Sequence, residues 1–365
     1  MPPTAAPSTA ARAATSRQMQ VDASGLSGEG GYEPPFRVTP EIVRHVADIG
    51  EAMGRIESEG GENVRPALRR ANRIRTVQST VEIEGNTLGV EEVAAVLDGR
   101  RVRAPPRDLL EVRNAFAAYE AMPDWMSHSV ADLLRAHQIM MDGLIEAPGR
   151  FRTGGAVVAG PEGVVHIAPP ASRVESLMSA LLGWLEETDE HPLIASSVFH
   201  FEFEFIHPFA DGNGRMGRLW QTLILARWKP LFAALPVESM IRDHRAGYYE
   251  ALRESGRAGE STGFVEYALR MIREVVLEHV RTEQVTEQVT EQVRRLLAVM
   301  DDSALSAREL MSRLQLTHRP NFLYNYLRPA LRHGFIAMTR PDAPRAHNQR
   351  YRLTPSGRHR AAAPG

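Results

Sequence analysis

Cysteine is absent from this chain of 365 residues. Disulfides, thiol nucleophiles and zinc sites with cysteine ligands are therefore excluded, and a chain without disulfides fits the cytoplasm, which is the compartment we expect. Lysine is almost absent as well: Lys229 is the only one among 43 basic residues, so the fixed positive charge is nearly all guanidinium. No apolar run approaches the roughly 20 residues that span a bilayer, so we expect no membrane association.

Two common catalytic signatures are also missing. The chain contains neither a G-x-x-x-x-G-K-[ST] phosphate loop nor an H-E-x-x-H zinc motif. Its hydrophobic fraction of 43% is ordinary for a globular protein. At this length we expect one main domain and at least one smaller one.

The charge is unevenly distributed along the chain. Residues 303–365 contain eleven arginines but only Glu309 and Asp342 as acids, a balance of +9. Because the whole chain has a net charge of −2, the preceding 302 residues sum to −11. A basic tail on an acidic body predicts a separate role for the tail, such as contact with nucleic acid.

The composition and apolar spacing predict five segments. Residues 1–31 are rich in Ala, Ser, Thr, Pro and Gly without an apolar period, which is typical of a disordered tail. Helical spacing of apolar residues dominates residues 39–283. The segments after the tail are predicted as an N-terminal helical region at 32–125, a core at 126–275, a connecting helix at 276–300 and a small domain at 301–365.

One stretch within the helical region has a β pattern. Residues 156–159 and 164–167 are short apolar runs on either side of a Gly-Pro-Glu-Gly turn. They predict one β-hairpin on an otherwise helical body. Its edge would offer backbone N–H and C=O groups for pairing with an extended peptide.

The basic tail has the order of elements of a winged helix-turn-helix. Ser306 and Glu309 are spaced as a capping box and predict a helix that ends near Leu316. A second helix and two short strands, at 335–339 and 349–353, follow. Such a domain binds DNA through its second helix, with arginines on phosphates, or docks on proteins; DNA is the interpretation we prefer.

The chemically richest stretch is HPFADGNGRMGR, residues 207–218. Glycines at a helix start turn partly positive N–H groups toward one point, which is an anion site suited to phosphates. Arg215 and Arg218 share a helix face and can both bind phosphate oxygens. Asp211 supplies a hard oxygen ligand for Mg²⁺, and His207 can take up a proton near neutral pH. The stretch therefore predicts a site for phosphate transfer.

These residues resemble the Fic (Fido) motif, H-x-F-x-[D/E]-G-N-G-R-x-x-R, at every fixed position, and the resemblance extends over about residues 32–360. It implies a mainly α fold, a Fic-type helical bundle with a β-hairpin flap, followed by a small winged helix-turn-helix domain. It also implies a nucleotidyltransferase that moves AMP from ATP to a Ser, Thr or Tyr hydroxyl of a target protein docked on the flap.

The same resemblance assigns roles to individual residues. His207 deprotonates the attacking hydroxyl, Asp211 holds Mg²⁺, and Phe209 anchors the loop in the core. The flap valines Val157 and Val158 are expected to contact the nucleotide. The phosphates of ATP are expected on Gly212, Asn213, Gly214, Arg215 and Arg218.

Several other polar or aromatic residues have weaker signals. Tyr248 and Tyr249 are candidates either for stacking near the adenine or for packing. His200 and Glu204 share a face with His207, but we interpret the pair as part of the core and not as a metal site. His137 and His166 receive the same structural interpretation.

A second motif lies far upstream, in TVEIEGN, residues 80–86. Taken alone, Thr80 and Glu84 on one helix face with Gly85 after them fit an ordinary helix end. They also resemble the inhibitory pattern of the Fic family, [S/T]-x-x-x-E-[G/N]. The resemblance implies that Glu84 pairs with Arg218 and blocks productive binding of the γ-phosphate, so we predict an autoinhibited enzyme.

Other functions stay open at the level of the sequence. The Fic body could sense a nucleotide within a DNA-binding regulator, or the same site could remove AMP, with Glu84 positioning the water. A homodimer is an open assembly state. The sequence does not specify the target, the nucleotide preference or the activating signal.

Overall fold

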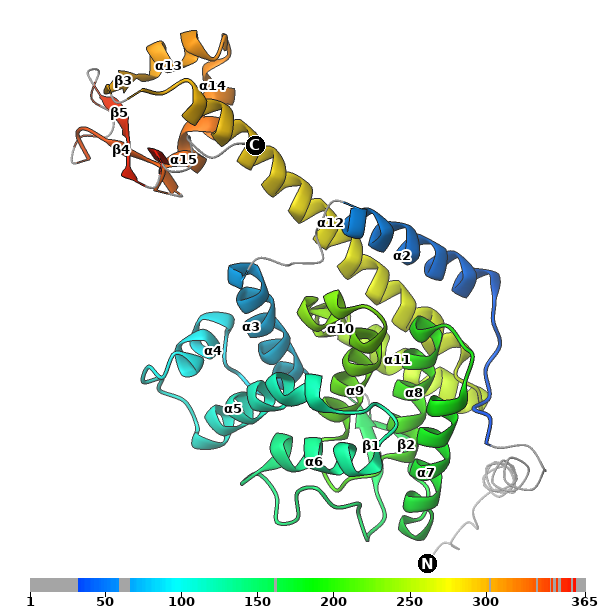
Figure 1. Ribbon diagram of the computed structural model, residues 1–365. Helices are drawn as coiled ribbons and strands as arrows, with labels where there is room; N and C mark the ends of the chain where they lie inside the picture. Colours follow the sequence, from blue (N-terminus) through cyan, green and yellow to red (C-terminus); the bar gives the residue numbers. More distant parts are fainter. Residues whose placement is uncertain are drawn as a thin grey trace, which may run out of the picture. The chain divides into compact units, whose positions relative to one another are not determined.

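The computed structural model describes most of the chain (Figure 1). The described residues are 32–58, 66–160, 163–301, 303–332, 334–341, 343, 346, 349–355 and 357–358, without the side chains of 58, 66–67, 158–160, 163–165, 282–290 and 332. The predicted disordered tail, residues 1–31, lies outside them. So do the side chains of most of the TEQV repeat in the predicted connecting helix.

Two compact units make up the chain, Met1–Leu277 and Glu278–Gly365. The predicted boundary near residue 125 is not a boundary between units, because one hydrophobic core runs from Val77 to Ile224. The predicted connecting helix is likewise not a separate element. It is the second half of α12 (Thr262–Ala298), which begins in the first unit.

The described residues of the first unit form helices apart from one hairpin, as the apolar spacing predicts. Its helical elements up to residue 258 are α2 (Pro40–Ser58), α3 (Pro66–Ile83), α4 (Val90–Leu97), α5 (Pro106–Ala121), η1 (Met122–Asp124), α6 (Val130–Met141), α7 (Ala171–Glu187), α8 (Pro192–Ile206), α9 (Asn213–Trp228), η2 (Pro230–Ala234), α10 (Val237–Asp243) and α11 (Arg245–Ala258). The mainly helical fold class is confirmed.

Helices α8 and α9 form the centre of this unit (Figure 1). Nearly every residue of the two helices up to Leu225 is buried, polar residues included, which is expected of central helices. Phe199 and Phe203 of α8 and Trp220 of α9 are completely buried in the main core. The tight packing of this pair fixes the ends of the loop between them, residues 207–212, which carries the motif.

The predicted hairpin is present as β1 (Val157–Gly160) and β2 (Gly163–Ile167), paired antiparallel. Val157 lies opposite Ile167, and the register shifts between Val158 and Ala159. Helix α11 packs against β2. Within the described residues, no helix is both long and apolar enough to cross a membrane.

The second unit has a core of its own. Its elements after α12 are β3 (Leu305–Ser306), α13 (Ala307–Arg313), α14 (Arg319–Asn321), the π-helical η3 (Phe322–Leu327), α15 (Arg328–Arg332), β4 (Ile336–Met338) and β5 (Arg350–Leu353), with the strands in the order β3-β5-β4. The capping box is present: the Glu309 N–H donates to Ser306 Oγ, and Glu309 accepts from the Ser306 N–H. The first helix ends at Arg313, earlier than predicted, because Gln315 adopts a left-handed conformation with φ 57°.

Candidate active site

His207 lies where α8 ends, and its backbone terminates the helix. It adopts φ 50° and ψ 61°, and its N–H donates to the Phe203 carbonyl at 2.9 Å. A non-glycine residue in the left-handed region is uncommon and is held there by its surroundings. Burial lowers the pKa of His207 to about 4, so its imidazole is neutral at neutral pH and is able to accept a proton.

Arg152 holds this strained turn in place, although no sequence pattern singles it out. The buried guanidinium donates to the carbonyl of His207 at 2.7 Å and to that of Ile206 at 3.2 Å. It also donates to the carbonyls of Gly154 and Pro169, which flank the hairpin, at 2.7 and 2.5 Å. One side chain therefore connects both ends of the flap to the backbone of the candidate base.

The motif loop is fastened from inside by Phe209 and Asn213. Phe209 is fully buried and stacks on the His137 ring, with centroids 3.6 Å apart. The Asn213 side chain exchanges two hydrogen bonds of 2.9 Å with the Phe209 backbone. The oxygen and one N–H of its amide are thus occupied in holding the loop. The anchoring role expected of Phe209 fits this geometry.

His137 is a structural residue, as the sequence indicated, but it also orients the loop. Its Nδ1 accepts from the Gly149 N–H at 2.8 Å, so the proton is on Nε2, which donates to the Asp211 carbonyl at 3.0 Å. Burial lowers the pKa of His137 to about 4, which keeps this neutral tautomer. The hydrogen bond from His137 therefore fixes the backbone of Asp211, the candidate metal ligand.

The predicted anion site lies at the start of α9. Gly212 precedes the helix with φ 84°, a conformation that favours glycine. At Gly214 the requirement is space, since an added Cβ would lie 2.5 Å from Glu84 Oε1 and 3.0 Å from Arg218 Nη1. The Glu84 carboxylate thus lies directly against the first turn of α9, where the unsatisfied N–H groups favour an anion.

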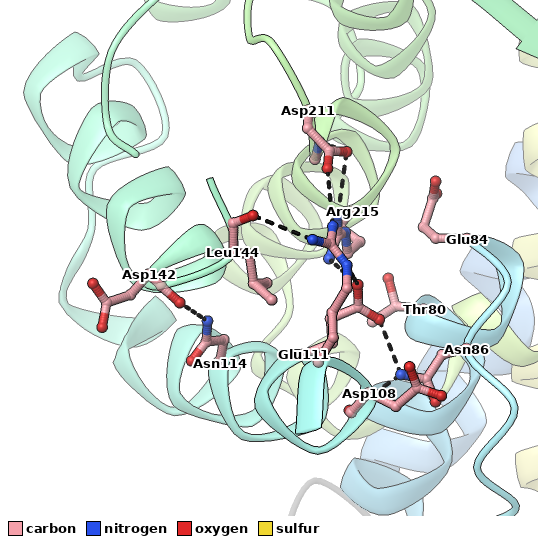
Figure 2. Close-up of polar contacts among 12 residues, drawn as sticks. Thr80, Glu84, Asn86, Asp108, Glu111, Asn114, Asp142, Leu144, Asp211 and Arg215 are labelled. Atoms are coloured by element: carbon pink, nitrogen blue, oxygen red, sulfur yellow. Dashed lines mark hydrogen bonds and ion pairs between the residues drawn. The ribbon is translucent and has the colours of Figure 1, made fainter. Parts of the chain in front are cut away.

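Arg215 is buried between two carboxylates (Figure 2). Its Nη2 is 3.4 Å from Asp211 Oδ1, and its Nη1 is 3.8 Å from Glu111 Oε1. Arg107 reaches Asp211 from α5, with Nη2 3.5 Å from Oδ2. Glu111 also accepts from the Asn86 side chain at 2.9 Å. Arg107 and Glu111 were missed from the sequence, because they lie about one hundred residues before the motif and belong to no recognisable pattern.

The residues present fit Mg²⁺ in one respect. Asp211 offers a partly exposed carboxylate at the loop, and among the residues the structure describes no group of three or more His, Asp or Glu side chains could enclose a metal. Mg²⁺ is commonly held by one or two carboxylates and completed by water and substrate phosphates. A single carboxylate beside an anion site matches that mode.

Arg218 meets the second motif directly. Its Nε donates to Thr80 Oγ1 at 3.1 Å, and its Nη2 donates to the Thr80 carbonyl at 3.0 Å and to Glu84 Oε1 at 2.7 Å. The residue is 2% exposed. Burial alone would lower the pKa of Arg218, but the Glu84 carboxylate and other acidic neighbours outweigh this effect and raise the pKa. The guanidinium therefore stays protonated. Gly85 follows with φ 101°, as a helix end requires.

Comparison with known proteins places this site in a family. A profile of the Fic/DOC family matches residues 127–225, and one of the C-terminal domain of "Filamentation induced by cAMP protein Fic-like" matches residues 291–354. The crystal structure of a Fic family protein from Desulfovibrio desulfuricans G20 is 53% identical, with a TM-score of 0.69, and the match covers 89% of this chain and 99% of that one. The chain belongs to the Fic family.

Other Fic relatives are more distant. Protein adenylyltransferase Fic from Nematostella vectensis is 25% identical over 233 residues, 60% of this chain and 52% of the relative. That from Aedes aegypti is 27% identical over 251 residues, 63% of this chain and 47% of the relative. This Fic chain thus spans about half the length of these curated relatives. Fic-1 from C. elegans, at 22% identity and a TM-score of 0.55, shares the fold.

The two tyrosines proposed near the nucleotide of this Fic protein differ in their exposure to solvent. Tyr248 is 2% exposed and packs in a core cluster with Phe264, and its hydroxyl is 3.1 Å from His200 Nε2. The expectation of an adenine contact is therefore wrong for Tyr248, because the inward face of α11 buries its ring. Tyr249 is partly exposed, with the Arg245 guanidinium 5.7 Å from its ring centroid, and its nucleotide contact stays a prediction.

On the flap of this Fic chain, Val157 is 54% exposed and Ile167, opposite it, is 69% exposed. The side chain of Val158 lies outside the described part of the structure, so the expected nucleotide contacts of the two valines stay predictions. His200 is a core histidine, as predicted, with Nδ1 2.7 Å from Gln221 Oε1. The His166 ring nitrogen Nε2 is 3.1 Å from the Phe205 carbonyl, which also agrees with a structural role.

Proposed function

We propose that this protein is an autoinhibited adenylyltransferase that transfers AMP from ATP to a hydroxyl side chain of a target protein. The observation that carries the proposal is the convergence, on one loop and helix start, of a neutral His207, the Asp211 carboxylate and two buried arginines. The name of its relatives, protein adenylyltransferase Fic, supports the same activity.

Each residue of the site has a separate role in the proposed AMP transfer. The His207 imidazole takes the proton of the target hydroxyl, whose oxygen then attacks the α-phosphorus of ATP. A new P–O bond to the target forms while the bond to the β-phosphate oxygen breaks, and pyrophosphate leaves. Arg215, Arg218 and the N–H groups of α9 stabilise the charge on the phosphates. Asp211 would hold Mg²⁺, which when bound neutralises phosphate charge.

Inhibition by Glu84 follows from the hydrogen bonds of Arg218. Its guanidinium already donates hydrogen bonds to Thr80 and Glu84. The Glu84 carboxylate lies against Gly214, where a phosphate would approach α9. A γ-phosphate would have to displace this carboxylate. Without the γ-phosphate on Arg218, the α-phosphate is not aligned with the incoming hydroxyl, so the resting enzyme is expected to be largely inactive.

Two ATP preparations test the activity. Protein labelled by ATP carrying ³²P at the α-phosphate, but not by ATP carrying it at the γ-phosphate, demonstrates AMP transfer. Label from the γ-position would instead show phosphorylation. His207→Ala is the control, and CTP, GTP and UTP labelled at the α-phosphate test nucleotide preference. A chain that binds ATP but labels no protein in any form would support the nucleotide-sensor alternative.

Removal of AMP is a second candidate, favoured by one observation. The Glu84 side chain is 31% exposed while it contacts Arg218, so a water could reach its carboxylate beside the bound phosphates. Incubation with a target carrying labelled AMP would release label in this case. Loss of that release in Glu84→Gly, with a gain of transfer, would assign both directions to the same site.

We propose that a target segment pairs with the outer edge of β1. The Ala168 N–H donates to the Ala156 carbonyl at 3.1 Å, and Val157 with Ile167 is the next pair. Hydrogen-bonded and non-hydrogen-bonded pairs alternate along an antiparallel ladder. The N–H and C=O of Val157 therefore point away from β2, toward an added strand, whereas those of Val158 point toward β2.

We also propose that the second unit is a winged-helix module that binds duplex DNA. Arg308, Arg319, Arg340 and Arg352 are exposed, and within the described residues of this unit none of them forms an ion pair. On the second helical segment, Tyr324 is 59% exposed with the Arg328 guanidinium 4.3 Å from its ring centroid. Unpaired exposed guanidiniums favour phosphate contacts.

A further inference from the structure

Glu204 is a buried acid that the chemistry above does not use. It lies on the last turn of α8, three residues before His207, and is 6% exposed. Its Oε2 is 3.9 Å from His207 Nδ1, and its Oε1 is 3.9 Å from His200 Nε2. Burial raises the pKa of Glu204 to about 7, although the Arg218 charge lowers it.

Two buried polar atoms at this point have no hydrogen-bond partner. They are His207 Nδ1 and Glu204 Oε1, on the two residues that face each other, although the backbone of Glu204 lies close enough to the imidazole to raise the His207 pKa. Unsatisfied buried groups are rare and costly, and they cluster where a functional state completes the contact. A movement of about 1 Å would bring the facing Nδ1 and Oε2 to hydrogen-bond distance.

We propose that Glu204 is the positioning residue for His207, accepting a hydrogen bond from Nδ1–H when the site is engaged and thereby leaving Nε2 free as the base. The proposal rests on the proposed function. The contact fixes one tautomer of the imidazole. After His207 takes the hydroxyl proton, the same carboxylate stabilises the imidazolium charge, as the acid of a hydrolase triad does for its histidine.

The surroundings of Glu204 suggest how this contact responds to inhibition. The charged or titratable groups that face it are His200 and His207 from α8, Arg218 from α9, Glu84 after α3 and Tyr248 from α11. Glu84 raises the pKa of Glu204 and so favours its neutral form. The γ-phosphate that would replace Glu84 on Arg218 is also an anion, so the charge beside Glu204 would stay negative when inhibition is released.

Glu202 provides a matched control on the same helix. It is equally buried, and burial raises its pKa to about 7 as well. Its partner, however, is the Tyr32 hydroxyl at 2.8 Å and not a residue of the motif. Glu202→Gln and Glu204→Gln thus remove the same charge from the same helix, and only the second removes it from the neighbourhood of His207.

Steady-state transfer in a Glu84→Gly background provides the first test. We expect Glu204→Gln to lower kcat roughly 10- to 100-fold, with the KM for ATP within about twofold of the parent. In the parent, protonation of Glu204 as the pH falls removes the partner of His207 and lowers kcat/KM. In Glu204→Gln this acid limb should move to lower pH, because only His207 then titrates, while Glu202→Gln keeps the limb of the parent.

A second measurement does not depend on activity. The full chain is labelled with ¹⁵N-histidine, and the His207 resonance is assigned by its loss in His207→Ala. In Glu202→Gln this resonance should show the Nδ1–H tautomer. In Glu204→Gln the His207 pKa should be lower than in Glu202→Gln. Unchanged His207 resonances with an unmoved acid limb would overturn the inference. A raised KM for ATP at constant kcat would overturn it too, since Glu204 would then act through Arg218. Absence of AMP transfer in the parent, with the His207 shift present, would contradict only the proposed function.

Discussion

Glu84 Oε1 lies 2.7 Å from Arg218 Nη2, although 134 residues separate the two in the chain. Arg218 is buried, and a buried guanidinium without an anionic partner is strongly unfavourable. In the resting protein Glu84 supplies that partner, and during transfer the γ-phosphate of ATP would replace it. The carboxylate and the phosphate would therefore compete for one side chain, which is the physical basis of the proposed autoinhibition.

His207→Ala should abolish AMP transfer in the Glu84→Gly background while ATP binding is kept. In the proposed mechanism the imidazole acts on the target hydroxyl in the chemical step, whereas the phosphates are bound by α9 and the arginines. Labelled transfer and calorimetric ATP titration of the same preparation measure the two effects. Transfer near the parent rate would remove His207 from the mechanism.

The motif could be read from the sequence because its chemical groups are local. His207, Asp211 and Arg215 lie within nine residues of one loop and helix start, so their spacing already implies one site. The helical body and the hairpin were also predictable, because apolar spacing and turn residues act over short distances.

What escaped prediction depends on contacts across the fold. Arg152 acts through the carbonyl of His207, 55 residues away, and a carbonyl leaves no mark on the sequence. Glu111 of α5 reaches Arg215 of α9 only because the fold brings the two helices together there. Of two adjacent tyrosines, packing of α11 alone decided that Tyr248 is buried and Tyr249 is not.

Arg152→Met should destabilise the protein and impair transfer together. The substitution removes the donor to the buried carbonyl of Ile206 and to the partly buried carbonyls of His207 and the flap, which is expected to cost on the order of 2–4 kcal/mol. Thermal or urea unfolding measures the loss. Arg150→Met, at an exposed arginine two residues earlier, is the control and should leave the unfolding midpoint unchanged. Equal midpoints for the two variants would contradict the structural role of Arg152.

Val157→Pro should lower transfer to the target protein more than it lowers ATP binding. Proline removes the N–H that points to the outer edge of β1 and leaves the pairing with β2 intact. Val158→Pro removes an N–H that points to β2, so it should damage the hairpin and lower both quantities. If the two variants behave alike, the target does not bind as an added strand.

Binding of the full chain to duplex DNA should weaken steeply as salt rises, since arginines release counterions from phosphates. Replacing Arg319 and Arg328 by alanine should weaken binding and reduce the salt slope by about 1 for each phosphate that an arginine no longer neutralises. Arg257→Ala, at an exposed arginine of α11, is the control. No binding at low salt would leave docking on a protein as the role of the second unit.

The most direct test of the central claim is the initial rate of AMP transfer from ATP labelled at the α-phosphate, compared among wild type, Glu84→Gly and the double variant Glu84→Gly/Arg218→Ala. Removing the carboxylate frees the Arg218 guanidinium for the γ-phosphate, so Glu84→Gly should label both itself and the target at least roughly tenfold faster than wild type. The double variant should lose that gain, because the freed arginine is what binds the phosphate. A folded Glu84→Gly protein that is no faster than wild type would contradict the account and leave residues 80–85 as a helix end with no inhibitory role.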